Sequence, residues 1–224
     1  MWLSNSSIGR KVVMSVTGIA LVLFLTFHML MNLVALFSAE GYNTVCEFLG
    51  TNWYALIGTL ALAALFVIHI VYAFWLTMMN RAARGSERYA VSAKPKTVEW
   101  ASQNMLALGV VVILGLLLHL FNFWYNMMFA ELIGNPMMGG LEATDGYGYI
   151  MATFSNPVFF VLYIVWLCAL WFHLTHGFWS AMQTLGWNNT TWINRWKCIS
   201  NIYSTIIVLG FMLVAVVFFV KGLF

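Results

Sequence analysis

The sequence has few charged residues: only 8% of its 224 positions are Asp, Glu, Lys or Arg. Hydrophobic residues make up 62% of the chain, and the mean hydropathy is +0.87. Because soluble domains contain about a quarter charged residues, this composition excludes an ordinary soluble fold. The chain is expected to be an integral membrane protein with a single transmembrane domain over residues 1–224.

Five stretches of the sequence contain no charged residue. Each is longer than the ~20 residues that a helix needs to cross a ~30 Å hydrocarbon layer. We therefore predict an all-α bundle of five transmembrane helices. The expected spans are 12–37, 53–80, 98–129, 157–185 and 198–220.

The basic residues lie almost entirely on one side of these spans. Short loops rich in Lys and Arg stay in the cytoplasm, so the N-terminus is predicted to be cytoplasmic and the C-terminus outside. We interpret the net charge of +3 as topology and a docking face, not as nucleic-acid binding. Of the ten basic residues only Lys221 is outside, and the others are Arg10, Lys11, Arg81, Arg84, Arg88, Lys94, Lys96, Arg195 and Lys197.

Other signals are missing as well. The three cysteines, Cys46, Cys168 and Cys198, form neither a CxxC motif nor a zinc-binding spacing. Residues 1–4 lack a charged segment and a cleavage site, so we expect no removable signal peptide. The serines from Ser4 to Ser7 are candidates to cap the first helix.

All the histidines of the chain lie in the predicted spans, where an ionisable side chain is costly and usually functional. With ~1.5 Å of rise per residue, His28 lies ~25 Å beyond Lys11, and His119 lies ~30 Å beyond Glu99. Both are therefore expected in the outer half of the membrane. His69 and His173 each lie ~17–18 Å from the cytoplasmic end of their spans, in the inner half.

Two facing imidazoles suit the axial positions of a haem iron, and helix bundles build such sites from facing helices. A small residue stands four positions from three of the candidates: Gly115, Ala73 and Gly177. We interpret these as space for a porphyrin. A hydrogen-bonded packing role explains a single intramembrane histidine equally well, but it explains two pairs at matched depths less easily.

The fifth histidine, His176, is three residues from His173 on nearly the same helix face. We prefer His173 as the ligand because its depth matches that of His69 better. His176 would then hydrogen-bond a haem propionate or a backbone carbonyl.

These residues resemble a known family, the dihaem cytochrome b membrane-anchor subunit of succinate dehydrogenase and quinol:fumarate reductase, of the five-helix single-polypeptide type. The likeness covers nearly the whole chain. In the family the fourth ligand stands four residues before a glycine, which also favours His173. The matching motifs are Phe27-His28 with Asn32, Ala39-Glu40 with Asn43, His69-Ile70-Val71-Tyr72, Leu118-His119 and Phe172-His173-Leu174-Thr175-His176-Gly177-Phe178-Trp179-Ser180.

The resemblance implies two haem b groups, an outer one bound by His28 and His119 and an inner one bound by His69 and His173. It also implies a flavoprotein subunit carrying FAD and an iron–sulfur subunit docked on the cytoplasmic face of a bacterial cytoplasmic membrane. Electrons would pass between them and a membrane quinone, with menaquinone expected, and no dicarboxylate chemistry would occur in this chain. Some members carry a Glu two residues before the fourth ligand; here that residue is Trp171, so its proton route does not carry over.

Further site residues follow from the resemblance. Ser15 and Gln103 are the first candidates to contact the haem propionates, followed by Arg10 and Lys11. Glu40 and Glu47 are candidates for the quinone site because they lie near the expected outer haem, with a solvated loop as the alternative.

Two rival functions stay open. A cytochrome b anchor of another quinone-linked complex, such as a hydrogenase or formate dehydrogenase, would share the haem ligands. A transporter with histidine proton relays is disfavoured because no carboxylate lies within a span, and such relays usually contain carboxylates.

Overall fold

The structure, a computed structural model, describes residues 6–50, 52–84 and 99–224. The predicted basic residues Arg88, Lys94 and Lys96 lie outside these ranges. All regular elements in the described residues are helices, and five of them are long and apolar enough to cross a membrane. The prediction of an all-α, multi-pass bundle of five spanning helices is confirmed.

The five membrane-spanning segments agree with the predicted spans in number and order. The third begins seven residues later than expected and the fifth six residues earlier. The segments are Ser7–Leu36, Trp53–Ala83, Met105–Leu132, Pro157–Thr184 and Trp192–Lys221. They contain, in turn, α2 (Ser7–Leu33) with the 3₁₀ turn η1 (Val34–Leu36), α4 (Trp53–Arg84), α6 (Met105–His119) with η2 (Leu120–Phe129) and α7 (Ala130–Leu132), α9 (Pro157–Thr184) and α10 (Trp192–Lys221).

Capping explains where the first and fourth of these segments begin. Ser6 accepts a hydrogen bond from the Gly9 amide at 2.9 Å, which confirms the predicted serine cap for this one residue. Asn156 caps α9 in the same way, and Pro157 occupies its first turn, where the missing amide hydrogen is no loss.

The third segment starts late because the helix is interrupted at Asn104, whose ψ of 12° is not helical. The short helix α5 (Trp100–Gln103) lies before this break. Directly after His119 the chain continues as the π-helix η2. Stretches of π-helix often mark functional positions, and this one starts at a predicted haem ligand.

Both outer connections contain helices. The first forms α3 (Ala39–Phe48), capped by Ser38, which accepts from the Gly41 amide at 2.9 Å. The second forms α8 (Gly146–Ser155), capped by Asp145, which accepts from the Gly148 amide at 3.0 Å. This cap and packing against α10 and α3 stabilise α8 in a glycine-rich segment.

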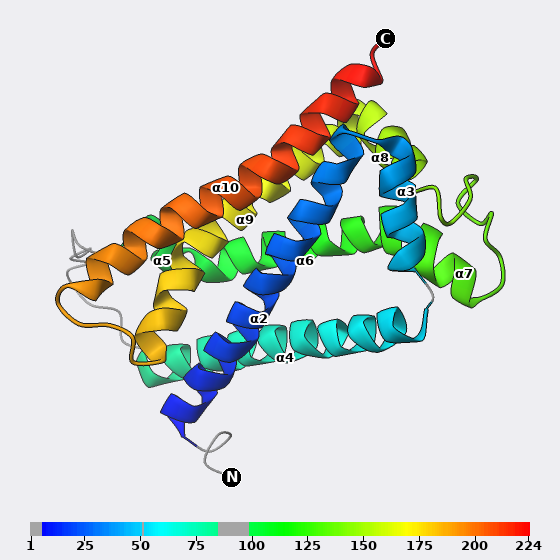
Figure 1. Cartoon of the computed structure of the whole chain (residues 1–224). Coiled ribbons are helices and arrows are strands. Elements are labelled where there is room, and N and C mark those ends of the chain that lie inside the picture. The colour runs from blue at the N-terminus through cyan, green and yellow to red at the C-terminus, as the bar shows by residue number, and fades with distance from the viewer. Residues whose placement is uncertain (1–5, 51, 85–98) are drawn as a thin grey trace.

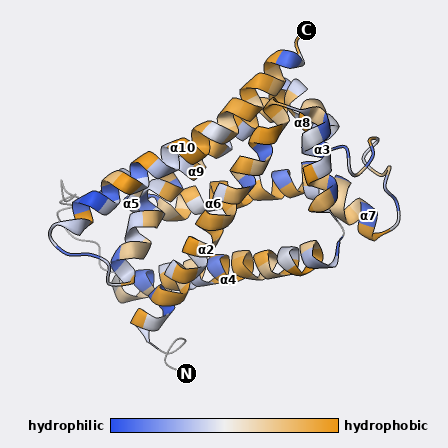
Figure 2. Cartoon of the chain, in the orientation of Figure 1, coloured by the Kyte–Doolittle hydropathy of each residue, from blue (hydrophilic) through white to orange (hydrophobic). Residues whose placement is uncertain are grey.

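The helices are packed unevenly (Figure 1). Helices α9 and α10 lie side by side, α2 packs on both, and α4 contacts chiefly α2. No residue in the most apolar stretch of α4 is buried within the chain. Most residues of the spanning helices are hydrophobic (Figure 2), and many large hydrophobic side chains are exposed, as expected of a surface that contacts lipid.

The two ends of the bundle differ in charge. The described basic residues Arg10, Lys11, Arg81, Arg195 and Lys197 belong to the end that holds the start of α2, the end of α4 and the α9–α10 connection (Figure 1). Five acidic residues, Glu40, Glu47, Glu131, Glu142 and Asp145, belong to the opposite end, with α3, α7, α8 and the C-terminus. By the positive-inside rule the first end is the cytoplasmic one.

Candidate functional site

The imidazole rings of His28 on α2 and His119 on α6 face each other across the outer half of the bundle. Their centres are 5.7 Å apart and their planes make an angle of 83°. The two helices thus bring together two imidazoles that one intervening span separates in the sequence. This is the pairing that the depth argument predicted for these residues.

Aromatic side chains surround this outer pair. Phe24 stacks on the His28 ring at 5.3 Å, and Phe211 lies 5.7 Å from it. On the other side, Phe123 lies 5.1 Å and Trp166 5.8 Å from the His119 ring. These rings pack around the two imidazoles and cover part of their surface.

Two polar residues connect His28 to the outer helix α3. Asn32 donates a hydrogen bond of 2.8 Å to the His28 carbonyl, and its amide nitrogen is 3.5 Å from both ring nitrogens. Tyr42 donates to the Asn32 side-chain oxygen at 3.1 Å. Burial, reinforced by the adjacent Cys46 thiol, raises the pKa of the Tyr42 hydroxyl, so it remains a donor at neutral pH.

The inner pair is held differently. His69 lies against α2, with Nδ1 3.1 Å from the Thr17 hydroxyl oxygen. His173 on α9 faces Gly109 of α6, where an added Cβ would come 3.9 Å from its Cε1. Nδ1 of His173 is buried and has no hydrogen-bond partner among the described residues. An unpartnered buried nitrogen of this kind needs a group to satisfy it.

His176 belongs to a different set of contacts, the cytoplasmic cluster of His176, Trp179, Glu99 and Lys197. Its Nδ1 is 3.7 Å from the Glu99 carboxylate, within ion-pair range but too long for a hydrogen bond. Its ring packs edge-on against Trp179 at 5.0 Å. These contacts direct His176 toward the cytoplasmic end, which favours His173 as the residue that faces His69.

Glu99 is the centre of the cytoplasmic cluster. Lys197 contacts its carboxylate at 2.9 Å, and the Trp179 indole donates to it at 3.2 Å. Burial alone would raise the pKa of Glu99, but Lys197, helped by Trp179 and His176, outweighs burial and lowers the pKa below its ordinary value of 4.5. The sequence interpretation treated Glu99 only as a marker of the span's end.

The predicted propionate contacts all lie near the cytoplasmic ends of their helices. Ser15 is buried, whereas Lys11 and Gln103 are exposed. The Arg10 guanidinium lies 4.3 Å from the centre of the Trp75 ring and donates to the Met79 sulfur, so its charge is engaged against α4.

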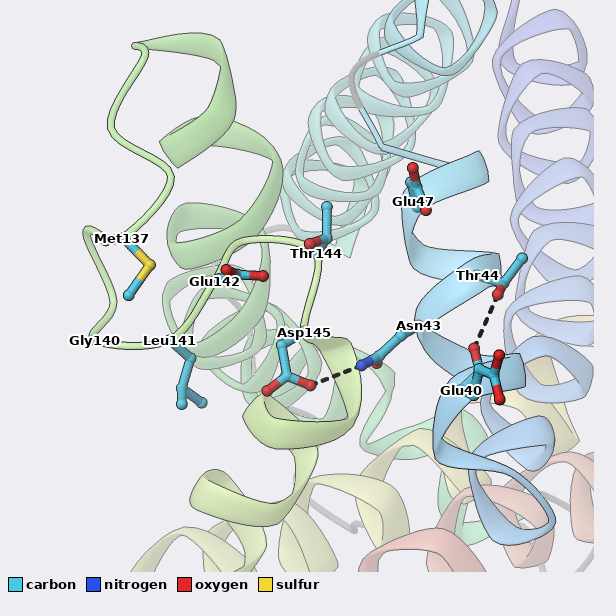
Figure 3. A pocket seen from close by; sticks show the side chains of 10 residues that line it. All are labelled: Glu40, Asn43, Thr44, Glu47, Met137, Gly140, Leu141, Glu142, Thr144 and Asp145. Atoms are coloured by element: carbon cyan, nitrogen blue, oxygen red, sulfur yellow. Dashed lines mark hydrogen bonds between the residues drawn. The ribbon is translucent and has the colours of Figure 1, made fainter.

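Glu40 and Glu47 lie together on a pocket of about 610 Å³ at the outer end (Figure 3). One wall is α3 and the other is the segment that leads into α8, and the Asn43 amide joins them by donating to Asp145 at 2.9 Å. The lining suits a polar or hydrogen-bonding group, because four carboxylates face it. The full lining is Glu40, Asn43, Thr44, Glu47, Met137, Gly140, Leu141, Glu142, Thr144 and Asp145.

The sequence predicted open space beside Gly177 and Gly115, and the structure has such space beside the first but not the second. A Cβ at Gly177 would meet nothing within 4 Å, as expected for open space near His173. At Gly115 an added Cβ would overlap the indole of Trp166, which donates to the Val112 carbonyl at 3.0 Å. The space at Gly115 therefore accommodates a tryptophan, and the prediction of a porphyrin vacancy there is wrong.

Larger metal sites are absent from the part of the chain that the structure describes, where no three His, Cys, Asp or Glu side chains form a group that could hold a metal ion. His28 and His119 are two histidines whose rings are in contact. No family model matches the chain, and no curated protein or solved structure is similar to it.

Proposed function

We propose that this chain is the membrane-anchor cytochrome b subunit of a succinate dehydrogenase or fumarate reductase complex, with two bis-histidine haems b. The observation that carries the proposal is the approach of His28 and His119. The ring centres of these two histidines are 5.7 Å apart, and their imidazole nitrogens would hold the outer haem iron.

The residues of the inner site also fit a haem. His69 and His173 would be its two nitrogen ligands, and the open space at Gly177 leaves room beside His173. A haem with two imidazole ligands exchanges single electrons and leaves no open position for oxygen. The protein's part is to hold the imidazoles and exclude water, the latter through Phe24, Phe123 and the neighbouring rings.

Two haem levels would give electrons a route across the membrane. The cytoplasmic end carries the basic residues and is the proposed docking face for a flavoprotein and an iron–sulfur subunit. The outer pocket, with Glu40 and Glu47, is the proposed place for the quinone head group, menaquinone being the expected quinone. The compartment is then a bacterial cytoplasmic membrane.

One observation favours a second candidate, a transporter with a histidine relay. Glu99 supplies a carboxylate 3.7 Å from His176, the partner that the spans themselves lack. The cytoplasmic cluster does not reach the outer pair, however, so a relay through it would stop in the inner half. A transporter of this kind would contain no haem.

The function is tested on the complex purified with its soluble subunits. Succinate should reduce haem b bands in the visible spectrum, and fumarate should reoxidise them. Reduction by formate or hydrogen but not by succinate would assign the chain to another quinone-linked complex. A complex without haem b bands would rule out both assignments.

A further inference from the structure

The hydroxyl of Thr17 contacts the imidazole of His69 in the interior of the bundle. Thr17 is on α2 and is only 5% exposed, and its Oγ1 lies 3.1 Å from Nδ1 of His69 on α4. No sequence pattern around Thr17 predicts this contact, which puts Thr17 at the level of the inner pair.

The other contacts of Thr17 favour one direction for this hydrogen bond. Oγ1 lies 2.9 Å from the Val13 carbonyl and 3.1 Å from the Met14 carbonyl, both of which can only accept. Thr side chains within a helix commonly donate their single hydroxyl hydrogen to such a carbonyl. With the hydrogen placed there, Oγ1 accepts from His69 and Nδ1 of His69 carries the hydrogen. With the hydrogen on Nδ1, the lone pair of the neutral His69 imidazole is on Nε2.

Gly18 leaves room for the His69 ring against α2. A Cβ at Gly18 would come 3.3 Å from Cε1 of His69 and 3.8 Å from Nδ1, which is tight for the first of these contacts. A larger residue would push the ring away from α2. The Thr17-Gly18 pair therefore sets both the tautomer and the position of His69.

From this geometry we infer that Thr17 is a positioning residue for the inner haem, which makes His69 present an unprotonated Nε2 to the iron. The inference rests on the proposed function. Metal-binding histidines generally donate their second N–H to a fixed acceptor, which orients the ring and increases its basicity. His173 has no such acceptor among the described residues, so the two inner ligands are unequal and His69 is the more electron-rich.

The test uses the full complex and three threonine variants. Thr17→Val removes the acceptor at similar volume, and Thr17→Ser restores it. Thr26→Val is the matched control, because Thr26 is on the same helix, bonds back to the Val22 carbonyl at 3.0 Å and contacts Tyr203 instead of a histidine. Redox titration followed optically, with low-temperature electron paramagnetic resonance, reports the two haems separately.

Thr17→Val should weaken haem retention at the inner site roughly tenfold, the lower end of the effect of such partners. It should also favour the reduced inner haem by up to about tenfold, which is about 59 mV for one electron, because a less basic imidazole stabilises ferric iron less. Thr17→Ser and Thr26→Val should resemble the wild type, and the outer haem should not change.

Three results would overturn the inference. One is an unchanged inner haem in Thr17→Val, and another is an equal change in both haems, which indicates a general structural effect. If Thr17→Val does not fold, Gly18→Ala is used instead. An unaltered inner haem in Gly18→Ala would contradict the positioning of His69 by Thr17 and Gly18. A wild-type complex without haem overturns the proposed function as well, whereas two haems insensitive to Thr17 overturn only this inference.

Discussion

Tyr42 donates a hydrogen bond of 3.1 Å to Asn32, and so joins the outer helix α3 to the residue one turn beyond His28. Asn32 in turn donates to the His28 carbonyl. The outer surface of the protein is therefore mechanically connected to a proposed haem ligand through two side chains.

Replacing Tyr42 by Phe should destabilise the protein by about 1 kcal/mol, because the partly buried side-chain oxygen of Asn32 loses its donor. The outer haem spectrum should broaden while the inner one stays sharp. Thermal unfolding in detergent and the low-temperature spectrum measure the two effects. Tyr147→Phe is the control, since its hydroxyl contacts only the exposed Lys221 at 3.1 Å among the hydrogen bonds described; equal behaviour of the two variants would count against the connection.

A second prediction concerns Gly115. Gly115→Ala should cost about 1–3 kcal/mol, because the added methyl overlaps the Trp166 ring and forces it to move. Since Trp166 lies 5.8 Å from the His119 ring, the outer haem should respond as well. The comparison is Gly58→Ala on α4, where a Cβ meets nothing within 4 Å and stability should be unchanged or slightly higher. Equal melting temperatures for the two variants would contradict this packing.

The cytoplasmic cluster predicts a pH-dependent stability. Because the pKa of Glu99 is lowered in the folded state, its contribution is present above the unfolded pKa and is lost as the pH falls through the folded pKa. The side chain is 38% exposed, so the ion pair contributes no more than about 1 kcal/mol. Glu99→Gln should therefore lower the melting temperature at pH 7 but not near pH 3. If Glu99→Gln lowers the melting temperature equally in a Lys197→Met background, the ion pair is not the source of the stabilisation.

Glu47→Gln tests the outer pocket. If Glu47 exchanges protons with the quinone, turnover should fall by about 10²-fold with the haem content unchanged. Glu131→Gln is the control, because Glu131 is an outer carboxylate that does not line this pocket. Quinone reductase activity at wild-type level in Glu47→Gln would leave the residue as part of a solvated loop.

Much of the fold could be predicted from the sequence, because a bilayer imposes simple rules. Charge-free runs of sufficient length gave the number and order of the spanning helices, and helix rise alone gave the depths of the histidines. The residues His28 and His119 meet where that depth argument put them. Their service as haem ligands stays a prediction.

Other features depend on side-chain contacts that a single sequence does not reveal. The helix α8 forms in a glycine-rich segment because Asp145 caps it and α10 supports it. The break at Asn104 and the π-helix after His119 likewise follow from local hydrogen bonding. Residue spacing suggested an empty space beside Gly115. It could not show that the side chain of Trp166, on helix α9, fills that space.

The haem content per chain tests the central claim most directly. The wild-type protein should contain two haems b, His119→Ala should retain one with the spectrum of the inner site, and His173→Ala should retain the other. A wild-type chain without haem, or a His119→Ala variant that still binds two, would contradict the proposed arrangement of paired histidines.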